Sequence, residues 1–132
     1  MWDIKAETVM TKNVVSARES TPARDIVLQL LSGHYTGMPV LDDEGRILGV
    51  VTEIDLLEAI KEGKSLSRTT AGEIMTKGAV TADVDAPLSK LIATMKEKNI
   101  LRLFITAQGK LAGIVARVDI LKSQIEPEFY VL

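Results

Sequence analysis

The chain contains no cysteine and one histidine, His34. Without cysteine, neither a disulfide framework nor a cysteine-ligated metal site is possible. A single histidine without clustered carboxylates disfavours a metal centre, and nothing in the sequence brings a nucleophile to it. We therefore expect no catalytic residues, no metal and no enzymatic activity. His34 itself is interpreted either as a surface histidine at a helix end or as a phosphate contact.

Long apolar runs are also missing. The longest, residues 111–116, is far shorter than the roughly 20 residues that span a membrane, and residues 1–3 begin no cleavable signal. The net charge of −2 argues against a general nucleic-acid binder. We expect a cytoplasmic protein with neither a membrane nor a nucleic acid as partner.

The two halves of the chain differ in charge. Residues 1–66 hold 7 basic and 11 acidic side chains, whereas residues 67–132 hold 9 basic and 7 acidic ones. The second half is the easier host for a phosphate, unless the difference is only scattered solvated charge.

What the sequence does contain is an internal repeat. Residues 9–15 (VMTKNVV) are similar in sequence to residues 74–80 (IMTKGAV), and residues 49–57 (GVVTEIDLL) are similar to residues 113–121 (GIVARVDIL). A repeat of this length indicates one supersecondary unit made twice. Because units of about sixty residues are marginal alone, we expect the two to share a core within a single module of residues 1–132.

Hydrophobic periodicity predicts the order strand–helix–strand–strand–helix in each copy. In the first copy the strands are predicted at 14–15, 38–41 and 47–51. One helix is capped by Thr21 and ends at Gly33, and another begins at Thr52. We place repeat 1 at about 3–63, a linker at 64–70, repeat 2 at 71–125, and a tail, separated from the last helix by Pro127, at 126–132. The residues expected to face inward are Ile26, Val27, Leu30, Leu31, Leu56, Leu57, Ile60, Leu88, Leu91, Ile92 and Met95.

The strongest local pattern is Gly49-x-x-Thr52-x-x-Asp55, at the turn from a buried strand into a helix. Glycine permits close approach of a ligand, a helix N-terminus favours phosphate, and Asp55 suits the two ribose hydroxyls of a nucleoside. Thr52 and Asp55 also fit a capping box, which requires no ligand. Both interpretations stay open at this point.

The second copy keeps the acid but loses the hydroxyl. Ala116 stands in place of Thr52, yet Asp119 remains, with Arg117 beside it. A carboxylate retained without its capping partner favours a role of its own, and Arg117 suits phosphate at a helix N-terminus. The alternative for Arg117 is a solvated residue in the first helical turn.

Together these blocks resemble the two repeats of a cystathionine β-synthase (CBS) domain pair, also called a Bateman module. The resemblance covers roughly residues 3–124. In the first copy it rests on residues 9–11, 38–42, Gly45 and 49–56. In the second copy it rests on residues 74–76, Gly109, 113–115 and 119–121.

The resemblance implies an α+β fold of tandem β-α-β-β-α repeats, packed sheet to sheet about a pseudo-twofold axis with two clefts. It implies regulatory binding of AMP, ADP, ATP or S-adenosylmethionine, with no cofactor required. Aspartate binds ribose, a hydroxyl residue contacts ribose or phosphate, and backbone before the hairpin contacts adenine. The candidate ligand-binding residues are Lys12, Val14, Gly37, Met38, Pro39, Thr52, Asp55, Lys77, Ala79, Arg102, Leu103, Arg117 and Asp119.

The second cleft departs from this pattern through Leu103 and Ala116, so it is either degenerate or adapted to a more charged ligand through Arg102 and Arg117. We expect a stand-alone nucleotide sensor acting on a separate protein partner, with a ligand-free dimeric scaffold as the alternative. Partly uncovered apolar side chains at Ile54, Leu57, Ile120 and Leu121 predict an interface, and the resemblance implies that this interface forms a face-to-face homodimer with twofold symmetry.

Overall fold

The fold comes from a computed structural model that describes residues 4–33 and 36–131, with side chains up to residue 125. His34 lies outside the described residues. The chain forms two compact units. We call Val15–Ala79 the central unit, and Met1–Val14 with Val80–Leu132 the terminal unit.

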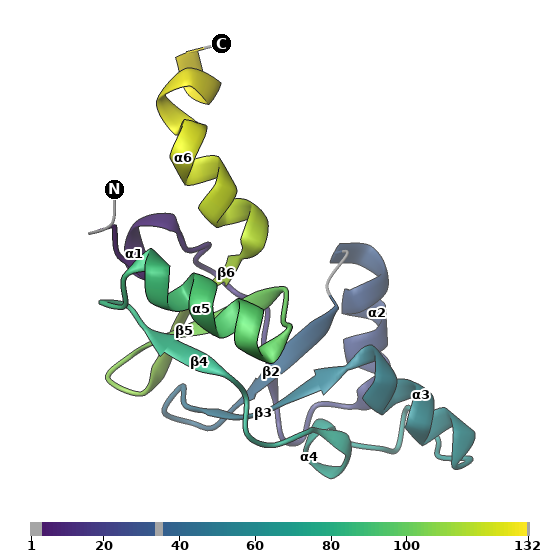
Figure 1. Ribbon diagram of the computed structural model, residues 1–132. Helices are drawn as coiled ribbons and strands as arrows, with labels where there is room; N and C mark the ends of the chain where they lie inside the picture. The colour runs from purple at the N-terminus through teal and green to yellow at the C-terminus, as the bar shows by residue number, and fades with distance from the viewer. Residues whose placement is uncertain (1–3, 34–35, 132) are drawn as a thin grey trace. The chain divides into compact units, whose positions relative to one another are not determined.

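The central unit holds a three-stranded sheet in the order β1-β2-β3. β1 pairs parallel with β2, starting at Ala17 opposite Val40, and β2 pairs antiparallel with β3, with Gly37 opposite Thr52. Helices α2 and α3 contact β2 and β3, respectively (Figure 1). The elements of this unit are β1 (Ala17–Arg18), α2 (Ala23–Gly33), β2 (Gly37–Leu41), β3 (Ile47–Thr52), α3 (Glu53–Lys61) and α4 (Ala71–Ile74).

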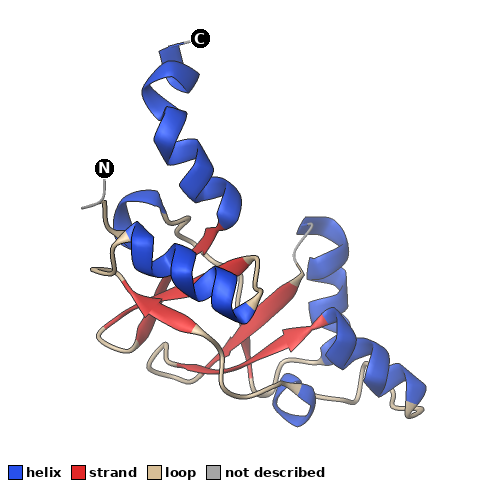
Figure 2. Cartoon of the chain, in the orientation of Figure 1, coloured by secondary structure: helices blue, strands red, loops and turns tan. Residues whose placement is uncertain are grey.

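The terminal unit repeats this plan with the sheet order β4-β5-β6. Thr81 pairs parallel with Phe104, and Arg102 pairs antiparallel with Ala116. Figure 2 shows α5 lying over this sheet. The elements are α1 (Ala6–Val9), β4 (Thr81–Asp83), α5 (Leu88–Lys98), β5 (Arg102–Ala107), β6 (Lys110–Ala116) and α6 (Arg117–Val131).

These two mixed sheets with their helices confirm the predicted α+β class and the duplicated unit. Even the hairpin irregularity is duplicated. The register shifts between Val40 and Leu41 in one unit and between Ile105 and Thr106 in the other.

Three predicted element boundaries are wrong. The first strand lies at Ala17–Arg18 rather than at 14–15. Helix α2 begins at Ala23, because the Thr21 hydroxyl accepts a hydrogen bond from the Arg18 amide (2.9 Å) instead of capping the helix. Helix α6 continues through Pro127 to Val131, so the proline does not separate a tail from the last helix.

The buried residues form two clusters, one in each unit. The repeats exchange the short helices that precede them in sequence, α1 and α4. Ala6, in α1, is fully buried among second-repeat residues, and Ala71, in α4, is fully buried among first-repeat residues. Each sheet therefore completes its core with the short helix that precedes the other repeat in sequence.

Several helix positions predicted to face inward are exposed instead. Leu31, Leu57 and Ile60 are 74%, 59% and 52% exposed, and Ile92 is 45% exposed. Conversely Ile120, expected on the uncovered face, is buried in the core of the terminal unit at 6% exposure. Among the described residues, no helix combines the length and the apolar character needed to cross a membrane.

Candidate functional site

The exchange of leading helices places the residues that follow each helix against the other repeat. In the central unit, the amides and carbonyls of Val50 and Thr76 exchange two backbone hydrogen bonds, both 2.9 Å. In the terminal unit, Thr11 and Ile114 exchange the equivalent pair, at 2.9 and 3.0 Å. Each crossing segment therefore pairs with the strand that leads into the helix carrying a candidate aspartate.

Gly49 and Gly113 are explained by these crossings rather than by a ligand. A Cβ on Gly49 would lie 2.8 Å from the Thr76 carbonyl oxygen. A Cβ on Gly113 would lie 2.8 Å from the Thr11 carbonyl oxygen and 2.7 Å from the sulfur of Met10. The close backbone approach inferred for Gly49 is present, but the approaching group belongs to the chain itself.

Just after each crossing the backbone turns through a left-handed residue. Asn13 has φ 60° and Gly78 has φ 81°, which asparagine and glycine tolerate best. The preceding side chains, Lys12 and Lys77, are exposed. This shared turn sets the direction in which the chain leaves each crossing.

Asp55 is held by its own helix and by the crossing segment. Its Oδ2 accepts hydrogen bonds from the Thr52 amide (2.8 Å) and the Thr52 hydroxyl (3.0 Å), and the Asp55 amide donates to that hydroxyl (3.3 Å). This confirms the capping-box interpretation. Its Oδ1 accepts a hydrogen bond from the Thr76 hydroxyl at 2.9 Å, a contact that the sequence did not suggest.

Asp119 occupies the same position in the terminal unit with fewer partners. Its Oδ2 accepts a hydrogen bond from the Ala116 amide at 2.7 Å. Within the described part of the chain, its Oδ1 receives no hydrogen bond. Asp119 is half-buried, as Asp55 is. The second helix start thus presents a partly desolvated carboxylate with one uncommitted oxygen.

The remaining candidates divide between the two units. Lys77 and Ala79, from the second repeat in sequence, lie in the central unit with Asp55, whereas Lys12 and Val14 lie in the terminal unit with Asp119. The central unit also contains Gly37, Met38, Pro39 and Thr52, and the terminal unit also contains Arg102, Leu103 and Arg117.

Three of these candidates are core residues. Met38 is 2% exposed, Leu103 is fully buried, and Pro39 is among the largest fully buried side chains. Their side chains pack the two cores, so any ligand contact at these positions is left to the backbone. The exposed candidates are the basic ones: Lys12, Lys77, Arg102 and Arg117.

The acidic run at residues 42–44 is a structural turn. Asp42 Oδ1 accepts hydrogen bonds from the Glu44 amide (2.8 Å) and the Arg46 amide (2.9 Å), and Arg18 pairs with Asp43 (3.2 Å). The hydrogen bond from the Arg46 backbone is the main cause that lowers the pKa of Asp42. Among the described residues, no three histidines, cysteines or acids gather as a metal site.

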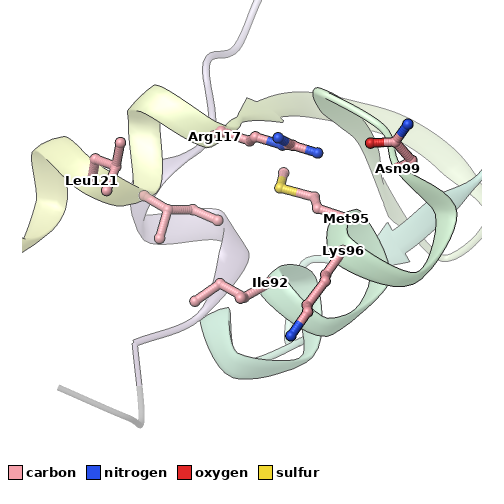
Figure 3. A pocket seen from close by; sticks show the side chains of 7 residues that line it. Ile92, Met95, Lys96, Asn99, Arg117 and Leu121 are labelled. Atoms are coloured by element: carbon pink, nitrogen blue, oxygen red, sulfur yellow. The ribbon is translucent and has the colours of Figure 1, made fainter.

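A groove of about 500 Å³ lies between α5 and α6. Ile92 and Met95 line it from α5, and Leu121 lines it from α6 (Figure 3). Arg117 extends toward Asn99 at its other end, where the Arg117 Nε donates to the Ile100 carbonyl oxygen at 3.0 Å. The groove is mainly apolar with basic residues at its margin.

Comparison with known proteins gives this architecture a family. The CBS domain family model matches the chain twice, at residues 6–62 and 71–126. A homoserine O-acetyltransferase of Methanococcus vannielii is 30% identical over 86% of this chain and 23% of its own length. A 5′-AMP-activated protein kinase subunit gamma of Kluyveromyces lactis is 29% identical over 88% of this chain and 38% of its own length.

The fold also matches solved structures. CBSX2, solved in complex with AMP, is 24% identical with a TM-score of 0.78, over 94% of this chain and 98% of that one. The chain spans less than two fifths of the two curated relatives described above, so it corresponds to one part of those longer proteins.

Proposed function

The chain belongs to the CBS domain family as a tandem pair, and on that premise we propose that it is a regulatory module that binds an adenosine compound. One observation carries the proposal. In both units a half-buried carboxylate, Asp55 or Asp119, stands in the first turn of a helix, after a partly buried strand and beside a crossing segment.

This arrangement suits a nucleoside chemically. The two neighbouring ribose hydroxyls are donors, and a carboxylate is an acceptor with about four lone-pair sites. Hydrogen bonds to an ionised acceptor are the stronger kind. The exposed basic residues offer phosphate contacts: Lys77 in the central unit, and Lys12, Arg102 and Arg117 in the terminal unit.

The relatives support the same class of ligand. The fold accommodates AMP in CBSX2, and the Kluyveromyces lactis relative is a subunit of an AMP-activated kinase. AMP, ADP, ATP and S-adenosylmethionine are therefore the candidate ligands. We propose that they act as regulatory ligands and not as substrates. We propose that the receiver of the signal is a separate protein.

A thermal-shift panel of adenosine, AMP, ADP, ATP and S-adenosylmethionine tests the proposal. A ligand that binds only the folded state at 100 times its Kd stabilises it by about 2.7 kcal/mol, which corresponds to a Tm rise of several degrees. Guanosine and cytidine at equal concentration are the controls. No shift with any adenosine compound at millimolar concentration contradicts the proposed function.

We also propose that the module is a homodimer. Helix α3 exposes Ile54 and Leu57 at 64% and 59%, and α6 exposes Val118 and Leu121 at 66% and 67%. Unpartnered apolar faces of this kind mark interfaces. A second copy of this chain is the partner that the resemblance to CBS domain pairs implies. Light scattering that shows only monomer at micromolar concentration contradicts this part.

A second candidate function is a ligand-free dimeric scaffold. The observation in its favour is the complete capping box at Asp55, which gives that carboxylate a structural role without any ligand. The two functions separate in the thermal-shift panel, since a scaffold dimerises but responds to no adenosine compound.

A further inference from the structure

The two aspartates differ in how much of their hydrogen-bonding capacity the protein already uses. Asp55 accepts three hydrogen bonds, two from Thr52 and one from Thr76. Asp119 accepts one, from the Ala116 amide. With about four lone-pair sites on a carboxylate, Asp55 has one left and Asp119 has three.

The difference has two sources, one in the sequence and one in the structure. Ala116 has no hydroxyl where Thr52 has one, which removes one donor. Thr11 takes the place of Thr76 in the terminal unit and makes the same backbone bridge. In the described structure, however, the Thr11 hydroxyl does not donate to Asp119.

A ribose needs two acceptor sites for its adjacent hydroxyls. Asp119 offers them without rearrangement. Asp55 offers them only after a protein donor is displaced, and Thr76 is the donor contributed from outside the helix cap. Replacing one protein hydrogen bond by a ligand hydrogen bond gains little, so binding at Asp55 is weakened by about the strength of that bond.

We propose that Asp119 is the ribose site that fills first, and that the Thr76 hydroxyl is a specificity-determining latch that lowers ribose affinity at Asp55. This inference rests on the proposed function and assigns an order to its two sites. It also gives the Asp55 site, which fills second, a regulatory consequence. A ligand that fills the Asp55 site releases Thr76, and with it a hydrogen bond between α3 and the segment that follows α4.

Calorimetry with adenosine tests the order, because adenosine has no phosphate to be attracted by the basic residues. We expect Asp119→Asn to weaken the tighter binding event about tenfold or more, and Asp55→Asn to leave it within about twofold. Thr76→Val should strengthen the weaker event about tenfold, whereas Thr76→Ser, which keeps the hydroxyl, should restore the wild-type value. Thr11→Val is the matched control and should change neither event.

The latch also has a readout that needs no ligand. Thr76→Val should raise the unfolding equilibrium constant of the central unit about fivefold, while Thr76→Ser and Thr11→Val should not. Equal effects of Thr76→Val and Thr11→Val on unfolding overturn the latch.

The calorimetric outcomes separate this inference from the proposed function. If adenosine binds but Asp55→Asn removes the tighter event, or if Thr76→Val leaves the weaker event unchanged, the order of sites is wrong and the proposed function stands. If adenosine binds to no variant, the proposed function and the order both fail, and the unfolding comparison still decides whether the latch exists.

Discussion

Replacing Gly113 by alanine, which adds a single methyl group, should strongly destabilise the terminal unit. Its Cβ would lie 2.8 Å from the Thr11 carbonyl oxygen and 2.7 Å from the Met10 sulfur, whereas real Cβ contacts stay beyond about 3.0 Å. The flexible Met10 side chain can move away. The Thr11 carbonyl cannot move without breaking its hydrogen bond from the Ile114 amide.

The expected loss of stability follows from the hydrogen bonds that break and the steric strain that remains. Two backbone hydrogen bonds join Thr11 and Ile114, and each contributes about 1 kcal/mol. Forcing a methyl group into packed structure costs about 1–3 kcal/mol. Because losing the bonds relieves part of the strain, we expect Gly113→Ala to lower the free energy of unfolding by about 2–4 kcal/mol.

Urea unfolding measures this loss, and hydrogen exchange localises it. The Thr11 and Ile114 amides should exchange faster in Gly113→Ala, while those of Val50 and Thr76 keep their wild-type rates. Gly37→Ala is the control, because its Cβ would lie 3.3 Å from the nearest atom, the Val51 carbonyl oxygen. We expect that variant to stay within about 1 kcal/mol of wild type. Equal stability of the two variants would refute the crossing as the reason for Gly113.

Three further predictions follow from the surface and the hairpin. Leu121 is 67% exposed, so Leu121→Asp should leave the fold intact and convert the proposed dimer to monomer in light scattering. A dimer that persists in this variant would mean that α6 is not part of the interface. Arg117→Ala should lower the affinity for ATP more than the affinity for adenosine, and this difference should shrink as the salt concentration rises. Equal losses of affinity for both ligands at all salt concentrations would mean that Arg117 does not contact phosphate. The pKa of Asp42 is lowered in the folded state, so its contribution to stability is present above the unfolded pKa of about 3.9 and is lost as pH falls through the folded value. A fall in the protection of the Arg46 amide, relative to its intrinsic exchange rate at each pH, is the expected result in that acid range and should be absent in Asp42→Asn; protection that does not change with pH would contradict it.

The repeat and the α+β class were predictable because they depend on local patterns. Alternating and 3.6-residue apolar spacing place β2, β3 and α3 within a residue or two of their positions. The Thr52–Asp55 capping box was also predictable, since its two residues are three apart and belong to one helix start.

The exchange of α1 and α4 between the repeats was not predictable from the sequence. Ala6 and Ala71 are small apolar residues whose burial depends on which sheet they reach, and periodicity within one repeat carries no information about that. The Thr76 contact with Asp55 was missed for the same reason, because it spans 21 positions and exists only through the crossing.

The helix faces show a different limit. Leu57 and Ile60 fit an inward apolar stripe as well as Leu56 does, yet only Leu56 is buried, at 5% exposure. Apolar spacing identifies a stripe but not whether the sheet of the same chain or another molecule covers it. That ambiguity is the reason Leu57, predicted to face inward, is now part of the proposed dimer surface.

The most direct test of the central claim, that these helix-start carboxylates bind ribose, is a calorimetric cycle. Adenosine and 2′,3′-dideoxyadenosine are titrated into wild type and Asp119→Asn. The account predicts that wild type loses about tenfold or more in affinity when the ligand hydroxyls are removed, and that Asp119→Asn binds both ligands about equally. This corresponds to a coupling of about 1.5–3 kcal/mol. A coupling near zero, with adenosine still bound by both proteins, would contradict the claim.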